Sequence, residues 1–148
     1  MLILDTNVVS EIRKIRLGKA NAAVAAWTDG IDSAALYLST ITVFELELGV
    51  LRVERRDPKQ GAALRHWLDS QVLSEFAGRV LPVDVAVARR CAALRVPDAR
   101  GERDALIAAT ALVHRLTVVT RNVHDFRSTG VALLNPWEAR TSSAKGGA

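Results

Sequence analysis

Short apolar runs alternate with longer segments of helical periodicity along this chain. The runs are rich in Leu and Val, as is typical of buried strands, and the longer segments place apolar residues three or four positions apart. This alternation predicts βαβ units around a mainly parallel sheet, and therefore an α/β fold. The expected strands are residues 2–4, 36–39, 80–82, 117–120 and 131–134.

Polar residues and prolines mark the expected ends of the helices. Asn21 and Asp84 are suited to accept hydrogen bonds from a first helical turn, and Asp57-Pro58 combines an N-cap with a proline at the first helical position. Gly78 and Pro97 are expected to end helices. The helices are therefore expected at about 8–14, 22–27, 42–54, 58–77, 85–96 and 102–114.

Length and composition indicate one well-cored domain. The chain has 148 residues, of which 49% are hydrophobic and 24% charged, as in soluble globular proteins. We expect a single domain over residues 1–140 and a flexible tail over 141–148. The longest uncharged stretch, 33–44, is too short to cross a bilayer, and Asp5 interrupts the N-terminus before a signal-peptide apolar region, so a cytoplasmic location is expected.

Charge and cysteine content narrow the possible chemistry. A net charge of +4 and a pI near 9.8 favour a polyanionic partner, although a solvated basic surface explains the same numbers. The single cysteine, Cys91, lies in an apolar helical stretch and is expected to be a buried structural thiol. The three histidines lack a zinc-binding spacing, and no glycine-rich phosphate-binding motif occurs.

Acidic residues stand where strands are expected to turn into helices or loops. These residues are Asp5, Glu45, Asp104 and Asp125. In an open parallel sheet, the carboxyl ends of the strands share one edge, where ligands bind, so the four side chains should converge there. Clustered carboxylates repel one another unless a proton or cation intervenes, and Mg²⁺ or Mn²⁺ takes oxygen ligands.

Each acid also has an ordinary structural interpretation. Asp5 is able to cap the following helix, and Glu45 can be the fourth residue of a capping box that begins at Thr42. Asp104 is favoured in a first helical turn by the helix dipole, and Asp125 can cap a turn. Stability alone, however, gives no reason for all four to fall at the same edge of the sheet.

Several segments of the chain resemble those of PIN-domain nucleases, and among them VapC-type ribonuclease toxins. The matching segments are Leu4-Asp5-Thr6-Asn7, 39–46, 103–111, 120–126 and 134–137. The resemblance runs from residue 2 to about 138 and implies a three-layer α/β/α fold. It also implies Mg²⁺ or Mn²⁺, endonucleolytic cleavage of tRNA or another structured RNA, a homodimer, and a VapB-type antitoxin. Any DNA contact would be indirect, through the antitoxin.

The resemblance also assigns roles to individual residues. Asp5, Glu45 and Asp104 fall on the core acidic positions. All four acids are expected to serve the metal: Asp5 and Asp104 as its direct ligands, Glu45 by binding or orienting a metal-bound water or as a base, and Asp125 by supporting these ligands or holding a second metal. Some relatives have an acid where this chain has Asn122, so either Asn122 or Asp125 fills the fourth position. The remaining expected contributors are the supporting residues Thr6, Asn7, Thr120 and Asn122, and Arg121 as a phosphate ligand.

Two functions remain open at this point. The first is a metal-dependent ribonuclease, which also requires fixed positive charge near the rim of the acid pocket because the carboxylates alone would repel RNA. The second is a weakly catalytic or non-catalytic PIN-like subunit that binds an antitoxin and contributes to transcriptional autoregulation. The intact set of acids favours the first.

Overall fold

The computed structural model describes residues 1–138 and contains a five-stranded sheet with the strand order β3-β2-β1-β4-β5. All neighbouring strands pair in parallel, as expected from the alternating pattern. The strands are β1 (Leu2–Leu4), β2 (Leu36–Ser39), β3 (Val80–Leu81), β4 (Thr117–Val119) and β5 (Leu133–Leu134). The predicted α/β fold class is confirmed.

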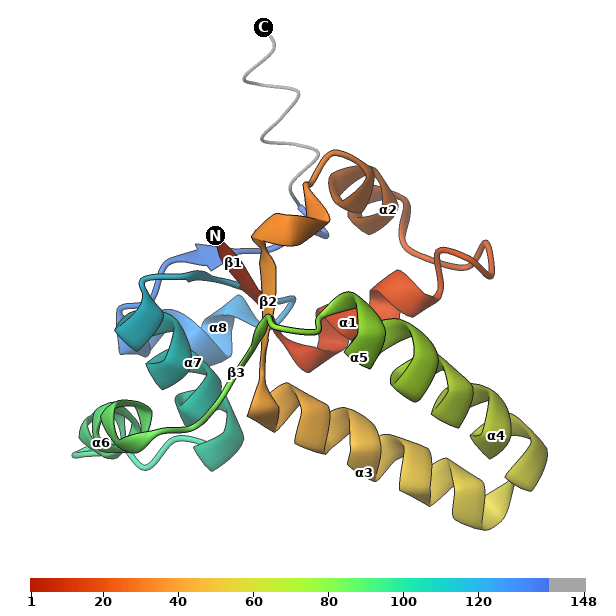
Figure 1. Cartoon of the computed structure of the whole chain (residues 1–148). Helices are drawn as coiled ribbons and strands as arrows, with labels where there is room; N and C mark the ends of the chain where they lie inside the picture. Colours follow the sequence, from red (N-terminus) through yellow and green to blue (C-terminus); the bar gives the residue numbers. More distant parts are fainter. Residues whose placement is uncertain (139–148) are drawn as a thin grey trace, which may run out of the picture.

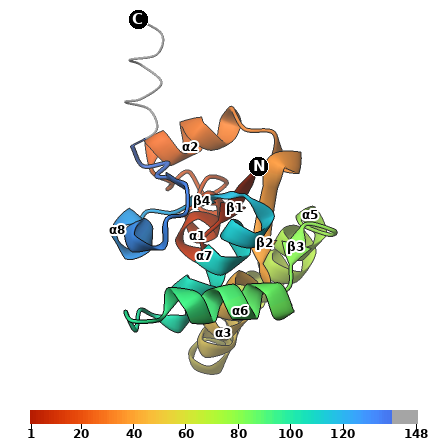
Figure 2. The same ribbon diagram turned by 90° about the vertical axis from the view of Figure 1, so that its left-hand side faces the viewer.

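Helices cover both faces of this sheet (Figure 1). Helices α7 and α8 lie on one face, with α6 outside α7, whereas α1 lies on the other face (Figures 1 and 2). The helices are α1 (Thr6–Arg13), α2 (Ala22–Asp29), α3 (Thr40–Arg56), α4 (Pro58–His66), α5 (Leu73–Glu75), α6 (Val85–Leu94), α7 (Glu102–His114) and α8 (Val123–Phe126). Short 3₁₀ turns are Ser33–Ala35 and Arg127–Thr129, and Trp67–Val72 is π-helical.

Local capping chemistry explains most helix starts. Asn21, Asp57 and Asp84 are the N-caps of α2, α4 and α6, and each side chain accepts hydrogen bonds from backbone N–H groups of the first turn. The three predictions are confirmed. Gly78 adopts a φ of +81°, which glycine tolerates better than other residues, between α5 and β3.

Two helices begin earlier than expected. Asp5 caps α1, which therefore starts at Thr6 rather than near Val8. Helix α3 starts at Thr40, because the Ser39 side chain accepts the hydrogen bond from the Ile41 N–H. The capping box proposed for Thr42 and Glu45 is consequently wrong, since both residues already lie inside the helix.

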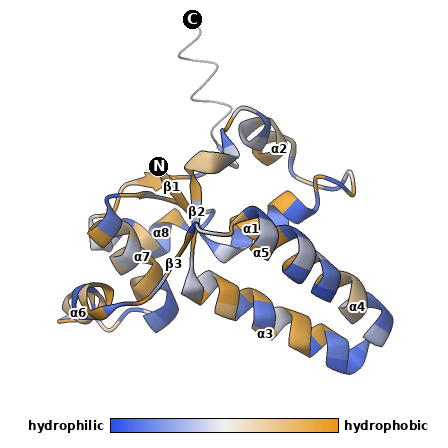
Figure 3. Ribbon diagram, in the orientation of Figure 1, coloured by the Kyte–Doolittle hydropathy of each residue, from blue (hydrophilic) through white to orange (hydrophobic). Residues whose placement is uncertain are grey.

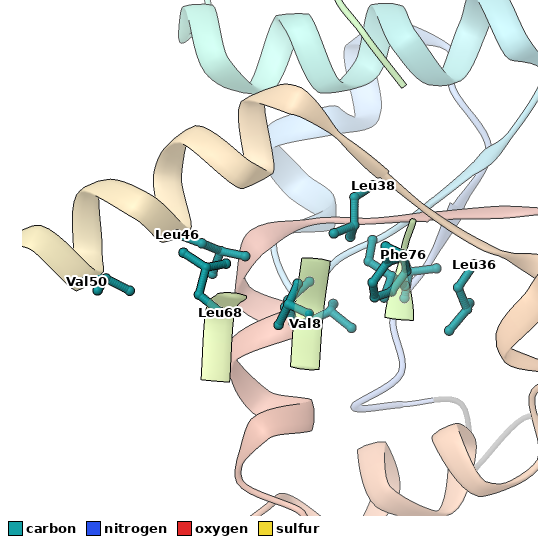
Figure 4. Close-up of a cluster of buried hydrophobic side chains, with 11 residues drawn as sticks. Val8, Leu36, Leu38, Leu46, Val50, Leu68 and Phe76 are labelled. Atoms are coloured by element: carbon teal, nitrogen blue, oxygen red, sulfur yellow. The ribbon is translucent and has the colours of Figure 1, made fainter. Parts of the chain in front are cut away.

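Each face of the sheet has its own hydrophobic core, because successive strand residues point to opposite faces. Leu4 and Val119 belong to the core that also contains residues of α1, α3 and the 67–76 region (Figure 4). Ile3 and Val118 belong to the core beneath α7 and α8. A smaller cluster joins α6 to α7 and includes the buried thiol of Cys91, as expected. This packing fixes the end of β1, which Asp5 follows, and the helices α3, α7 and α8, which carry Glu45, Asp104 and Asp125.

Helices α3 and α4 form an antiparallel hairpin that extends away from the sheet, and its connecting turn is hydrophilic (Figures 1 and 3). We call the part of this hairpin beyond Glu45, residues 46–66, the arm. The two helices approach closely at Gly61, where an added Cβ would lie 2.5 Å from the Glu54 Cα. Arg65 of α4 binds Glu47 and Glu54 of α3 across this junction.

The described residues include no helix that combines the length and apolar character needed to span a membrane. The tail predicted at 141–148 lies outside the described residues, as do residues 139 and 140 at the end of the predicted domain.

Candidate active site

Asp5 occupies the carboxyl end of the central strand β1 and is 5% exposed. One carboxylate oxygen accepts the Thr6 N–H at 2.8 Å, and the other accepts the Thr120 hydroxyl at 2.8 Å. Asn7 donates a longer hydrogen bond, 3.4 Å, to the second oxygen. Asp5 is thus both the predicted helix cap and a fixed carboxylate at the predicted site.

Glu45 approaches the same place from α3, one turn after the helix starts. Its Oε1 accepts the Thr6 hydroxyl at 2.7 Å, so a side chain 39 residues earlier in the sequence sets its position. Its Oε2 lies 3.6 Å from Nη1 of Arg103. The contacts of Glu45 therefore connect α1, α3 and α7 at one point.

Asp104 lies in the first turn of α7, and Asp125 lies in the short helix α8. Burial raises the pKa of Asp104 to about 6, and the negative charges of the neighbouring carboxylates add to the rise. In decreasing order of effect, those neighbours are Asp5, Asp125 and Glu45. The four predicted acids are therefore close enough to influence one another.

The pKa of Asp5 is also raised. Burial is the main cause, and the charges of Glu45 and Asp125 contribute, whereas the hydrogen bonds from Thr120 and Thr6 oppose the rise. Two acids thus share a raised pKa for the same pair of reasons, desolvation and mutual repulsion. A bound cation would offset both the cost of burying these carboxylates and the repulsion between them.

The residues fit a hard divalent cation in kind and in charge, because all four acids offer carboxylate oxygens. Within residues 1–138, however, no three Asp, Glu, His or Cys side chains already have an arrangement that can hold one metal ion. A metal ion held by three of these side chains would therefore require them to move closer together.

The predicted supporting residues surround Asp5. The Thr120 hydroxyl that donates to Asp5 also accepts the Asn122 N–H at 3.0 Å. Asn7 accepts the Arg121 N–H at 3.4 Å, and Thr6 holds Glu45 as described above. Asn122 uses its backbone in this network, and its exposed side chain caps no N–H of α8.

Sequence reasoning missed two functional candidates, Phe44 and Arg103. The Arg103 guanidinium carbon lies 5.0 Å from the centroid of the Phe44 ring, and the same side chain approaches Glu45. Both residues directly precede predicted acids, Glu45 and Asp104, which is the signal that sequence alone provided. Arg121, the predicted phosphate ligand, lies similarly over the Trp137 ring at 5.2 Å.

An apolar cavity lies elsewhere in the described part of the chain. It has a volume of about 270 Å³ and lies among α1, α2, β2 and the 67–76 region, with mostly apolar walls that include Val9, Ile12 and Trp67. None of the four acids lines it. We place the chemistry at the acid cluster because titratable groups with raised pKa values gather there.

Comparison with known proteins identifies the family of this chain. The model of the PIN domain matches residues 2–131. The chain belongs to the PIN-domain family. Two similar relatives of this PIN-domain protein are toxin FitB of Neisseria gonorrhoeae, 41% identical, and VapC ribonuclease Y4jK of Sinorhizobium fredii, 38% identical. Each alignment covers 93% of this chain and 99% of the relative.

Solved structures confirm the PIN fold. The crystal structure of FitAcB from Neisseria gonorrhoeae superposes with a TM-score of 0.83 at 40% identity, covering 93% of this chain and 99% of that one. A toxin–antitoxin complex from Klebsiella pneumoniae gives a TM-score of 0.61 at 25% identity, covering 92% and 98%. The predicted three-layer α/β/α fold and the resemblance to VapC-type PIN proteins are confirmed.

Proposed function

We propose that this PIN-domain protein is a Mg²⁺- or Mn²⁺-dependent endoribonuclease that acts as the toxin of a toxin–antitoxin pair. The observation that carries the proposal is the meeting of four acids from separate parts of the chain, with the pKa of Asp104 raised to about 6. Its relatives' names, a VapC ribonuclease and a toxin, support the same activity. We infer tRNA or another structured RNA as the substrate.

In this proposal, Asp5 and Asp104 are the metal ligands, and Asp125 or Asn122 completes the set. A bound divalent ion lowers the pKa of water, stabilises charge on phosphoryl oxygens and orients the reacting groups. Asp5 is suited to be the fixed ligand, because Thr6 and Thr120 hold its two oxygens in place. Asp125 is exposed and is suited to a more outlying position.

Glu45 acts on the attacking water in this proposal. The Thr6 hydroxyl holds Oε1, and this leaves Oε2, paired with Arg103 only at 3.6 Å, to orient the water and accept its proton. Arg121 follows Thr120 at the same edge of the sheet and is exposed, so its guanidinium is available to a phosphate. It also supplies part of the positive charge that an acidic site needs in order to admit RNA.

Cleavage by the purified, antitoxin-free protein tests the proposal. Structured RNA is incubated with Mn²⁺ or with EDTA, and the new RNA ends are sequenced, with Asp5→Asn as the matched protein. We expect discrete cuts that require both Mn²⁺ and Asp5. Equal cutting by Asp5→Asn would refute the assigned site, and no cutting by the wild type would favour the non-catalytic, antitoxin-binding subunit.

A VapB-type antitoxin is the proposed partner, as the toxin–antitoxin complex among the similar structures suggests. We propose that it inhibits by placing an Arg among Asp5, Glu45 and Asp104, because a guanidinium can bind carboxylates bidentately and offset their repulsion. Calorimetry with the cognate antitoxin should show weaker binding after Asp104→Asn and competition by Mn²⁺. If neither Asp104→Asn nor Mn²⁺ changes the affinity for the antitoxin, the inhibitory contact lies elsewhere.

Assembly completes the proposal. We infer a homodimer that contacts DNA only through its antitoxin. Analytical ultracentrifugation of the free protein should give twice the chain mass, and promoter DNA should bind the complex but not the free protein. A monomer, or direct DNA binding by the free protein, would contradict this part.

A further inference from the structure

Phe44 and Arg103 form a pair next to Glu45 of the acid cluster. Phe44 precedes Glu45 on α3 and is 52% exposed, although a large aromatic side chain gains stability from burial. Arg103 precedes Asp104 on α7, and its guanidinium lies over the Phe44 ring at 5.0 Å. An aromatic face and a fixed positive charge therefore stand beside two of the proposed catalytic acids.

The contacts that hold Arg103 are weak and easily exchanged. Its Nη1 lies 3.6 Å from Glu45 Oε2, which is long for a charge-assisted hydrogen bond, and its side chain is half exposed. A cation–π contact at an exposed site contributes about 0.5–1 kcal/mol. A guanidinium has five N–H donors, so most of them remain available to a phosphate.

Phe44 and Arg121 follow strands on opposite sides of β1, the strand that Asp5 follows. Phe44 belongs to the helix that follows β2, Asp5 ends β1, and Arg121 follows β4, and these strands are neighbours in the order β2-β1-β4. Strands two places apart are separated by about 10 Å. A nucleic acid strand that crosses the acid cluster therefore meets an arginine beside an aromatic ring on either side.

We propose that Phe44 and Arg103 form a nucleotide-binding subsite of this enzyme, in which an unpaired base stacks on the Phe44 ring and Arg103 binds the adjacent phosphate. Arg103 then leaves the ring face and Glu45 as the nucleotide enters. Aromatic side chains stack on bases of any sequence, so the subsite selects single-stranded or looped RNA rather than a duplex. This inference rests on the proposed ribonuclease function and identifies the form of RNA that enters the site.

Binding experiments separate the subsite from the cleavage reaction. A short single-stranded RNA with 2-aminopurine in place of one base, tested at successive positions, is titrated into protein that carries Asp5→Asn to suppress cutting. Phe44→Leu, Phe44→Tyr, Arg103→Gln and Arg103→Lys are compared in this background. Leu51→Ala is the matched control, because Leu51 lies on the same helix and is also 52% exposed.

We expect stacking to quench 2-aminopurine at one position, and we expect Phe44→Leu to abolish the quenching and weaken binding about 5- to 150-fold. Phe44→Tyr should retain the quenching and the affinity, and Leu51→Ala should change neither of them. Arg103→Gln should reduce the magnitude of the negative slope of log affinity against log salt by about 0.7, and Arg103→Lys should leave the slope unchanged. Affinity for fully paired RNA should be unaffected by Phe44→Leu.

Unchanged quenching and affinity in Phe44→Leu would overturn the subsite. If that variant instead altered the sedimentation mass with RNA binding intact, Phe44 would be a contact between copies of the chain, which also overturns the proposal. Loss of quenching in Phe44→Leu alongside a wild-type protein that never cleaves RNA would retain the subsite and refute the nuclease. The two failures are therefore distinguishable.

Discussion

Two groups of acidic side chains in this protein differ in how their charge is compensated. On the arm, Arg65 donates to both oxygens of Glu47, at 2.8 and 2.6 Å, and also binds Glu54. These hydrogen bonds from Arg65 hold the pKa of Glu47 below its ordinary value. At the edge of the sheet, burial and mutual repulsion instead raise the pKa of Asp5 and Asp104.

The difference separates a structural charge cluster from a functional one. The arm acids meet a guanidinium that satisfies them, and this arrangement joins two helices. Of the edge acids, Glu45 has an ion pair with Arg103, whereas Asp5 and Asp104 have no ion pair within residues 1–138. A fold that retains buried, repelling carboxylates loses stability there, and under the proposed function a bound cation would offset that loss.

The largest expected effect comes from removing one edge carboxylate. Asp104→Asn or Asp5→Asn should lower RNA cleavage at least about 100-fold, which is the scale of losing a group that participates directly in the reaction. Folding should be retained, because asparagine has nearly the same shape as aspartate and would still cap α1 in the Asp5→Asn variant. Initial cleavage rates and circular dichroism measure the two effects. The control is Glu47→Gln on the arm, which should cleave at the wild-type rate.

The next effect concerns the packing of the arm. Gly61→Ala should destabilise the protein by about 1–3 kcal/mol, because its Cβ would overlap the backbone of Glu54. Gly49→Ala on α3 is the matched control, since nothing lies within 4 Å of an added Cβ there, and it should stabilise by up to about 1 kcal/mol. Urea unfolding of both variants gives the values. Equal destabilisation would show that the close crossing is not what requires glycine.

Removing the arginine that neutralises the acids of the arm should have a smaller effect on stability. Arg65→Gln leaves Glu47, Glu54 and Asp69 without their shared partner and should lower the melting temperature by a few degrees. Cleavage by the folded variant should stay at the wild-type rate. A loss of activity below the melting temperature would mean that the arm acts on the site and that the two clusters are not independent.

The smallest effect is the pH dependence of stability without metal. The folded pKa of Asp104 is about 6 and its ordinary value is 3.8, so the folded state binds the proton more tightly. The ionised carboxylate destabilises the fold above pH 6, and this destabilisation disappears as the pH falls towards 4. Stability should therefore increase by about 1 kcal/mol, after allowing for solvent screening. Asp104→Asn should lose this gain when urea unfolding is repeated at pH 7 and pH 5.

Glu47 has the opposite effect on the pH dependence of stability. Its pKa is lowered in the fold, so its contribution is present above the ordinary value of 4.5 and is lost as the pH falls below it. The stability of the wild-type protein should therefore increase as the pH falls from 7 to about 5 and decrease at lower pH. Stability that decreases continuously as the pH falls from 7 would mean that the pKa of Asp104 is not raised in the folded protein.

Local chemistry made much of the fold predictable from sequence. Asn21, Asp57 and Asp84 cap their helices through backbone groups two or three residues away, so the signal is contained in a few positions. Strand positions were predictable because buried strands form continuous apolar runs. The convergence of Asp5, Glu45 and Asp125 followed from their places after β1, β2 and β4, without knowledge of the strand order. Asp104 instead lies in α7, which follows α6 rather than a strand, so its approach to the other acids depends on the tertiary fold.

The remaining features depend on contacts between distant residues. Glu45 fitted a capping box by spacing, but Ser39 took the cap, and Glu45 instead accepts a hydrogen bond from Thr6. The approach of Arg103 to Phe44 and Glu45 joins α7 to α3, and no local pattern indicates it. The π-helical turns of Trp67–Val72 were likewise not predicted, since their sequence has ordinary helical spacing.

Thermal unfolding with and without Mn²⁺ at pH 7.5 tests the central claim most directly. The account predicts that Mn²⁺ at about 100 times its dissociation constant raises the wild-type melting temperature by about 5 to 10 °C. Glu47→Gln should show the same increase, and Asp104→Asn should lose most of it. No increase in the wild type, or an equal increase in Asp104→Asn, would contradict the assignment of the edge acids as a cation site.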